Sequence, residues 1–271
     1  MKKLRPYDAI LIVMLVLCVA TVIVFGVPGI IVYADEKLGP LVRDTVPRLA
    51  VGALLTVYIL RSEYKATLVP RARGMWKSLL WCVPCFAVAV VNFPFSALIN
   101  GVAVIERVDL VWLFLLKCLS VAWMEELFFR AVLVPLAQKR FESVKGGTVW
   151  AVAVSSAVFG LFHFINLFYG ASVSGTLLQV GYTFLIGCML AVTLIKTQNV
   201  WLCIAVHFIF DIGGMIVTDL GRGAFQDGVF WALTVAAGAA CFVFIVAELV
   251  RIERNKVKAD ANRTDSAESE K

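Results

Sequence analysis

The stretch that decides the fold is WMEELFFRAV, residues 123–132. It places Glu125, Glu126 and Arg130 inside a largely apolar run that extends from about 109 to 138. A charged side chain at the centre of a bilayer costs at least about 2.5 kcal/mol, even on the lowest scales. Three such groups within six residues therefore need partners inside the protein.

The composition of the whole chain is that of a membrane protein. Of its 271 residues, 61% are hydrophobic and 16% are charged, whereas soluble domains have about 45–50% apolar and about 25% charged residues. One soluble core of this length cannot bury such an excess. We therefore expect an all-α, multi-pass helix bundle in the lipid bilayer. The net charge of +6 is interpreted as a topology signal, not as a nucleic-acid-binding surface.

Apolar runs of about 20 residues, long enough to cross the hydrocarbon, are predicted eight times. They cover residues 8–33, 46–61, 78–101, 109–138, 148–168, 174–195, 200–218 and 229–250. With these spans, 18 of the 25 Lys and Arg residues lie on one side of the membrane and five on the other. The asymmetry predicts that both termini are cytoplasmic, which requires an even number of spans.

The chain is predicted to form one integral-membrane domain, residues 1–250, in the cell membrane, and we expect a bacterial plasma membrane. Residues 251–271 end in KADANRTDSAESEK, a polar stretch without aromatic residues, which is typical of a disordered cytoplasmic tail. The loops are too short for a soluble catalytic domain, so any chemistry takes place in or at the membrane.

Both histidines of the chain, His163 and His207, lie within predicted spans. Asp211 follows His207 by four residues, so the two share one face of a helix. At about 1.5 Å of rise per residue, Glu125 lies about 20 Å, His163 about 22 Å, His207 about 12 Å and Asp211 about 18 Å from the cytoplasmic ends of their spans. Three helices can therefore bring these groups to one level in the bundle.

Glu126 and Arg130 are also four residues apart, and this spacing predicts an ion pair along one helix. Around the helix axis, Glu125 points about 100° away from Glu126. It therefore has no partner on its own segment. A carboxyl group in apolar surroundings binds a proton more readily than one in water. Close to histidines, Glu125 becomes a candidate general base for a water molecule. This is a hydrolase site without a serine or cysteine nucleophile.

Each of these groups also has a structural interpretation. The Glu126–Arg130 pair is more often structural than catalytic, and a histidine in a membrane is often a hydrogen-bonding group between helices. Asp211 can serve to hold His207. Lys117, which also lies inside the fourth span, can extend outward to the interface, and the sequence assigns it no role.

Three motifs resemble those of the CPBP intramembrane proteases, which include the CAAX prenyl endopeptidases and the Abi-type bacteriocin-processing proteins. EELFFR, residues 125–130, is similar to the family's EExxxR motif. FGLFH, residues 159–163, is similar to FxxxH, and HFIFD, residues 207–211, to HxxxB, in which B is Asn or Asp. The resemblance covers about residues 109–218, and the order and spacing of the motifs also match.

The resemblance implies an intramembrane endopeptidase that hydrolyses a peptide bond with an activated water. It implies that Glu125 is the general base, that His163 helps to bind the water, and that His207 and Asp211 stabilise the oxyanion. An ionised aspartate donates no hydrogen bond, so Asp211 either carries a proton or acts by orienting His207. The glutamate–arginine pair would then be structural. The expected substrate is a peptide or a membrane protein.

Two other functions stay open at this point. One is a catalytically silent regulator, scaffold or bacteriocin-immunity protein of the same fold. The other is a transporter, although no inverted repeat or matched pair of broken helices supports it. No cofactor is expected. Zinc is the alternative, but its three protein ligands would be Glu125, His163 and His207, which leaves no histidine for the oxyanion.

Overall fold

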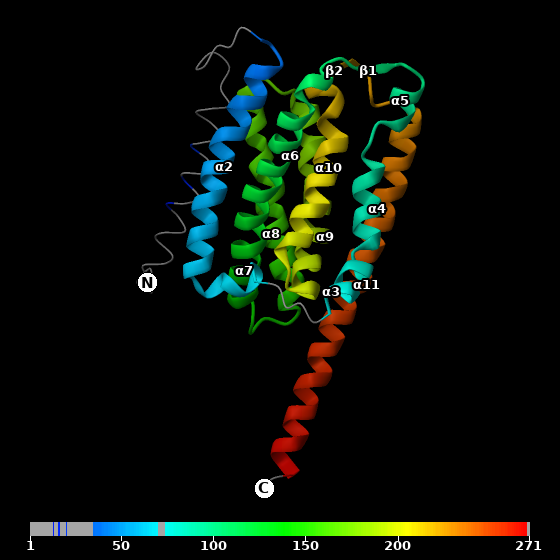
Figure 1. The fold of residues 1–271 in the computed structure, drawn as a ribbon. Helices are drawn as coiled ribbons and strands as arrows, with labels where there is room; N and C mark the ends of the chain where they lie inside the picture. The colour runs from blue at the N-terminus through cyan, green and yellow to red at the C-terminus, as the bar shows by residue number, and fades with distance from the viewer. Residues whose placement is uncertain (1–12, 14–15, 17–19, 21–34, 70–73, 270–271) are drawn as a thin grey trace.

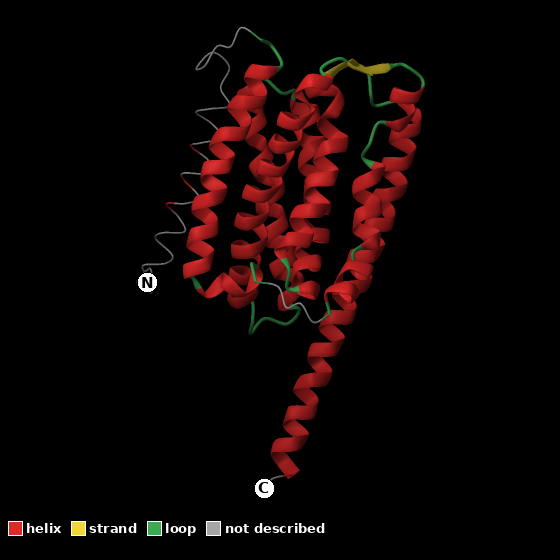
Figure 2. Ribbon diagram, viewed as in Figure 1, coloured by secondary structure: helices red, strands yellow, loops and turns green. Residues whose placement is uncertain are grey.

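The computed structural model describes residues 35–69 and 74–269, together with the isolated positions 13, 16 and 20. In this part the chain is a bundle of helices that run up and down along one direction (Figure 1). A single two-stranded sheet lies at one end, and little else is non-helical (Figure 2). The expected all-α class is confirmed. The predicted first span, 8–33, lies outside the described residues except for the isolated positions.

In chain order the elements are α2 (Leu38–Arg61), η1 (Glu63–Thr67), α3 (Met75–Trp81), α4 (Val83–Val91), α5 (Phe95–Ile99), β1 (Ala103–Ile105), η2 (Val108–Leu110), α6 (Val111–Glu126), η3 (Leu127–Leu133), α7 (Val134–Arg140), α8 (Gly147–Phe162), η4 (His163–Tyr169), α9 (Val173–Thr197), α10 (Val200–Leu220), β2 (Gly221–Gly223) and α11 (Gly228–Ser269).

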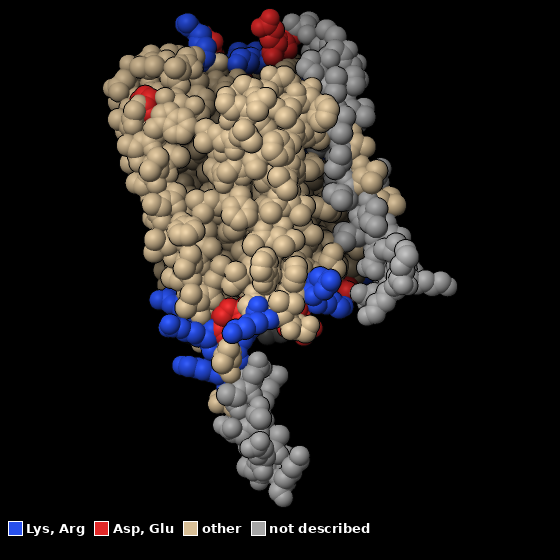
Figure 3. All heavy atoms as spheres, turned by 180° about the vertical axis from the view of Figure 1, so that it is seen from behind, with Lys and Arg blue, Asp and Glu red and all other residues tan. Residues whose placement is uncertain are grey.

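Four helical segments of the described chain are long and apolar enough to cross a membrane. They are Gly147–Tyr169, Val173–Thr197, Val200–Leu220 and Gly228–Ala259. Seen from behind, Lys, Arg, Asp and Glu side chains gather at the two ends of the bundle, and a broad uncharged band lies between them (Figure 3). Such a band suits the hydrocarbon layer, which is about 30 Å thick. The chain is therefore a helical membrane protein.

The predicted third span, 78–101, is not one helix. It is divided into α3, α4 and α5, with breaks at Cys82 and at Asn92–Pro94. Pro84 lies in the first turn of α4, where its missing N–H is harmless. Pro94 disfavours a helical conformation at the preceding residue, so α4 has to end before it.

The predicted fourth span, 109–138, changes its helical type in the middle. The α-helix α6 ends at Glu126, the π-helix η3 covers Leu127–Leu133, and α7 continues to Arg140. Seven residues of π-helix are unusual, and π-helical turns occur frequently at functional sites. The irregular segment begins directly after the two glutamates.

Helix α11 continues through Ser269, across the stretch for which the sequence predicts a disordered tail. The residues between 251 and 259 are mostly good helix formers such as Arg, Lys, Glu and Ala. Contacts with the bundle also hold the helix. Glu253 Oε1 accepts a hydrogen bond from the Thr148 backbone N–H at 3.0 Å, and Lys196 Nζ lies 3.1 Å from Glu248 Oε2.

The two-stranded sheet joins the chain after α5 to the end of α10, because β1 and β2 pair antiparallel. A side chain at Gly221 would place its Cβ 2.0 Å from the Val104 carbonyl oxygen, so this close approach requires glycine. At the same end, Arg107 Nη1 lies 2.9 Å from Asp35 Oδ2. Two backbone N–H groups at the start of α2, and then Arg107, lower the pKa of Asp35.

Lys117 does not extend outward. Its side chain is 9% exposed and lies between helices α2 and α10. Its Nζ is 2.8 Å from Asp219 Oδ2 and 3.3 Å from Asp44 Oδ2. Both carboxylates lie in helices that extend further toward the sheet than predicted, since α2 begins at Leu38 and α10 ends at Leu220. The lysine therefore connects three helices.

We expect Lys117→Met to destabilise the protein by about 3 kcal/mol, the lower end of the range for breaking a buried ion pair. The variant leaves the carboxylates of Asp44 and Asp219 without their shared cation. The matched control is Lys139→Met, whose ion pair with Glu63 is half exposed on both sides and should contribute less than about 1 kcal/mol. Thermal unfolding in detergent measures both. Equal decreases in melting temperature for the two variants would contradict the expectation that the buried ion pair contributes more to stability than the exposed one.

Candidate active site

His207 on α10 lies at the centre of a cluster of carboxyl groups. Its Nδ1 is 2.7 Å from Glu126 Oε1, its Nε2 is 3.4 Å from Asp211 Oδ1, and Nε2 is 3.9 Å from Glu125 Oε2. A carboxylate accepts hydrogen bonds, so Nδ1 carries a proton and donates it to Glu126. The side chain of His207 is 8% exposed. The structure thus brings residues of α6 and α10 together in one buried cluster.

The other ring nitrogen of His207 faces two carboxyl oxygens. In a neutral ring with its proton on Nδ1, Nε2 has a lone pair, which would oppose the oxygen lone pairs of Asp211 and Glu125. At least one proton therefore lies among Nε2 and these two carboxyl groups. The 3.9 Å distance to Glu125 is too long for a direct hydrogen bond, so the Glu125 oxygen stays free for another partner.

The ion pair predicted between Glu126 and Arg130 is confirmed. Arg130 Nη1 lies 2.9 Å from Glu126 Oε1, the same oxygen that accepts from His207. Glu126 is 0% exposed and Arg130 is 1% exposed. The Arg130 guanidinium carbon also lies 4.1 Å from the centre of the Phe159 ring, a cation–π contact. Glu126 therefore holds the histidine as well as the arginine, which the spacing of the motif does not predict.

His163 lies where α8 ends and η4 begins. Its Nδ1 is 3.0 Å from the Phe159 carbonyl oxygen, and because a carbonyl only accepts, Nδ1–H is the donor. In the neutral ring Nε2 is then free to accept. The ring of Phe159 contacts both His163 and His207, and so joins His163 to the cluster. All the candidate site residues from the sequence therefore lie in one connected group.

Phe159 is a central residue to which the sequence assigns no role of its own. It is 2% exposed, and its ring makes edge contacts with His163 and His207 at centroid distances of 5.2 and 6.0 Å. Gly160 and Gly187 let α8 and α9 approach closely here, since a Cβ at either position would lie within about 3.1 Å of a neighbouring atom. The feature of the sequence that could have identified Phe159 is its position as the phenylalanine of the FxxxH motif.

Asn92 is a second residue that the sequence does not connect with the site. Its Nδ2 donates to the Phe210 carbonyl oxygen at 2.7 Å, directly before Asp211. The contact comes from the break between α4 and α5. A Cβ on Gly214 would lie 2.9 Å from Asn92 Nδ2, so the glycine makes room for the amide. The irregular third span thus supports the helix that carries the histidine.

In the described part of the chain, no three His, Cys, Asp or Glu side chains are arranged to hold a metal ion. Because Nδ1 of both His163 and His207 is used in a hydrogen bond, Nε2 is the ring nitrogen that remains available to bind water or a metal ion. Such outer hydrogen bonds also orient histidines that bind zinc. The orientation of the rings therefore does not by itself separate a water site from a metal site.

Residues 107–213 match the family described as type II CAAX prenyl endopeptidase Rce1-like. This segment is about two-fifths of the chain, and it contains Glu125, Glu126, Arg130, His163, His207 and Asp211. A comparison with curated proteins finds no match. Fold and site define a helical membrane protein with a buried carboxylate–imidazole cluster, and the family implies a protease. Residues 107–213 are thus similar to the Rce1-like CAAX prenyl endopeptidase family, and the resemblance of the motifs in this segment is confirmed.

We expect Arg130→Ala to lower the abundance and the melting temperature of the protein, at a cost of about 3–5 kcal/mol. The variant removes the cation from the fully buried Glu126 and from the face of Phe159. The double variant Arg130→Ala with Glu126→Gln should recover part of this loss, because it removes both charges together. Melting temperatures in detergent measure both. A double variant no better than the sum of its single variants would contradict this coupling.

Proposed function

We propose that the protein is an intramembrane endopeptidase that hydrolyses a peptide bond with a water molecule activated by Glu125. The observation that carries the proposal is the direction of His207. Glu126 anchors its Nδ1, so that Nε2 faces Glu125 and Asp211 in a buried site. The family match supports the reaction class.

In the first step Glu125 takes a proton from the water, whose oxygen attacks the carbonyl carbon of the scissile bond. His163 is suited to hold this water, since its Nε2 is free and its ring is fixed by Phe159. General-base catalysis of this kind contributes about 10²–10⁴-fold. The proton on Glu125 then passes to the amide nitrogen, the C–N bond breaks, and the amine leaves.

The negative oxygen of the tetrahedral intermediate binds beside His207 Nε2 and Asp211, which lie next to each other. For Glu125 to act as the base, the proton near Nε2 must lie on His207 or Asp211, where it provides the hydrogen-bond donor to this oxygen; one such donor is worth about 10²–10³-fold in rate. Asp211 donates directly when it carries the proton, and otherwise aligns the ring. Glu126 and Arg130 are positioning residues, because they touch the histidine and not the substrate.

We further propose eight membrane spans with both termini in the cytoplasm of a bacterial cell, a peptide or membrane-protein substrate and no nucleic-acid partner. The distribution of Lys and Arg supports the orientation. Successive long helices of the described chain run in opposite directions along the bundle, which is consistent with this orientation (Figure 1).

Catalysis is tested by Glu125→Gln and His163→Ala. Both should abolish cleavage, by at least about 100-fold for the general base, while abundance and melting temperature stay near normal. Comparative peptidomics of the membrane fraction, with the wild type and with Glu125→Gln, measures the effect and reveals the substrates. Identical peptidomes from a well-expressed pair would favour the silent regulator of the same fold.

Metal dependence is tested separately. We expect the purified, metal-stripped protein to keep its activity in a strong chelator, because Glu125 and the two histidines act on water and oxyanion and not as ligands. Elemental analysis should find zinc well below one ion per chain. Activity that is lost to the chelator and restored by stoichiometric zinc would make Glu125, His163 and His207 the three ligands of a catalytic zinc.

The topology is tested by reporter fusions. Fusions near residues 70 and 142 and at the C-terminus should report the cytoplasm, whereas fusions near 105, 170 and 223 should report the opposite side. The reason is the excess of Lys and Arg in the first group of segments. One inverted signal would refute the eight-span arrangement.

A further inference from the structure

The site described above offers the oxyanion one hydrogen-bond donor. His207 Nε2 and Asp211 Oδ1 lie 3.4 Å apart, and by the proposed mechanism they share one proton. The other oxygen of Asp211 is enclosed by the protein and has no hydrogen bond with a described residue, so a ligand does not reach it. Oxyanions of acyl transfer are held by preorganised donors from the backbone or from Asn, Gln, Ser, Tyr or His side chains. We therefore looked for a further donor beside Asp211.

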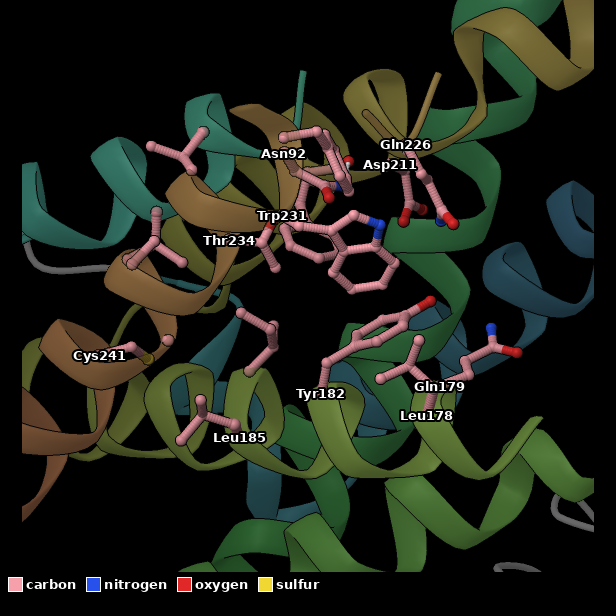
Figure 4. Close-up of a pocket in the computed structure, with 18 of the residues that line it drawn as sticks. Asn92, Leu178, Gln179, Tyr182, Leu185, Asp211, Gln226, Trp231, Thr234 and Cys241 are labelled. Atoms are coloured by element: carbon pink, nitrogen blue, oxygen red, sulfur yellow. Dashed lines mark hydrogen bonds between the residues drawn. The ribbon is translucent and has the colours of Figure 1, made fainter. Parts of the chain in front are cut away.

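The side chain of Tyr182 in α9 lies beside Asp211. Both residues line a cavity of about 310 Å³ between α4, α9, α10 and α11. The Tyr182 ring packs against Phe210, the residue directly before Asp211, and the two ring centroids are 6.1 Å apart. Figure 4 shows the hydroxyl of Tyr182 directed to the end of the cavity at which Asp211 lies. Tyr182 is 39% exposed, so a ligand can reach its side chain.

The depth of Tyr182 is that of the site and not that of an interface tyrosine. Tyr and Trp concentrate at the two ends of membrane spans, at the level of the headgroups. Tyr182 is nine residues after Val173, the first residue of α9, and Asp211 is nine residues before Leu220, the last residue of α10. Both of these helix ends lie at the sheet end of the bundle (Figure 1). The two side chains are therefore both about 13.5 Å from that end, near the middle of the hydrocarbon.

Asn166 and Gln179 orient the Tyr182 hydroxyl. Asn166 Nδ2 donates to Gln179 Oε1 at 2.8 Å, which fixes the amide of Gln179. The NH2 group of this amide is on the side of Tyr182, and Gln179 forms a side-chain hydrogen bond with the phenol oxygen (Figure 4). An amide nitrogen only donates, so the phenol oxygen accepts and its O–H is left to donate to another group. Accepting a hydrogen bond also polarises the O–H and makes it a stronger donor.

We propose that the Tyr182 hydroxyl is a second oxyanion donor, which acts together with the proton shared by His207 and Asp211. The inference rests on the proposed protease function and adds a catalytic residue to it. The phenol keeps its proton throughout, because it only donates a hydrogen bond to the negative oxygen. A tyrosine next to a protonated aspartic acid is a known combination for holding an oxyanion. The second donor also accounts for the aspartate at position 211, because the site does not then depend on an asparagine amide. Gln179 acts through Tyr182 as a positioning residue.

The test compares the binding of aldehydes with that of the matching alcohols to the full chain in detergent. An aldehyde adds water to become a tetrahedral diol, so it resembles the intermediate but contains no bond to cleave, and the alcohol lacks the second oxygen. The probes are acetyl-Leu-Leu-leucinal and acetyl-S-farnesylcysteinal, each with its alcohol, and titration calorimetry measures every Kd. We expect the wild type to bind at least one aldehyde about 100-fold more tightly than its alcohol, the lower end for transition-state analogues.

Matched variants separate the donor from a structural tyrosine. Tyr182→Phe should weaken aldehyde binding about tenfold, as expected for one lost hydrogen bond, and should leave alcohol binding unchanged. Tyr58→Phe removes a hydroxyl from α2, outside the cavity lining, and should change neither. Gln179→Met should weaken aldehyde binding by a smaller factor, and the double variant Gln179→Met with Tyr182→Phe should be no weaker than Tyr182→Phe alone. With a cleaved substrate, Tyr182→Phe should lower kcat about 100-fold at an unchanged KM.

Three results would overturn the inference: wild-type protein that binds each aldehyde no more tightly than its alcohol, Tyr182→Phe protein that keeps the full preference for the aldehyde, or equal losses of aldehyde and alcohol affinity in that variant. Because the binding assay requires no turnover, its result is separate from that of the proposed function. A preference that survives Tyr182→Phe in a chain that cleaves peptides would refute the role of Tyr182 and keep the protease. A preference that depends on Tyr182 in a chain without cleavage would refute the protease and keep the donor.

Discussion

The rest of the site depends on the two contacts made by one oxygen atom of Glu126. It accepts the hydrogen bond of His207 and lies 2.9 Å from the guanidinium of Arg130. Because Glu126 is fully buried, water cannot replace either partner. Through Arg130 the contact extends to the ring of Phe159, whose carbonyl holds His163. The two histidines are thus oriented by a single connected set of polar and aromatic contacts.

The antiparallel helices α6 and α10 are connected at two levels, by Glu126–His207 in the site and by Lys117–Asp219 nearer the sheet. The two contacts are separated by about 13 Å along α6 and about 18 Å along α10, and the long lysine side chain spans the difference. Sliding one helix by a turn, about 5.4 Å, would break both contacts. Together they set the register that brings the carboxylates to the histidine.

Local spacing was enough to predict the pairs that lie on one helix, Glu126–Arg130 and His207–Asp211, because residues four apart share a helical face. Helical rise from the span ends further predicted that His207, Glu125 and Asp211 come together, and these three groups are in one cluster. The contact between Glu126 and His207 joins residues 81 apart in the chain and depends on how α6 is rotated toward α10. The positions of the hydrophobic runs in the sequence do not determine that rotation. The partners of Lys117 were missed for a related reason, since the predicted helix ends fell a few residues short of both carboxylates.

Helix α11 has a practical consequence for imaging this protein. Its 42 residues correspond to about 63 Å of helix at 1.5 Å per residue, about twice the thickness of the hydrocarbon. The part beyond the bundle continues the same helix (Figure 1), and hydrogen bonds to Thr148 fasten it at its base. A rigid protein joined in helical phase after Lys258 would keep a fixed orientation relative to the bundle. The fused protein would serve as a marker outside the membrane. It would give this small membrane protein the recognisable asymmetric shape that is needed to align images of single particles.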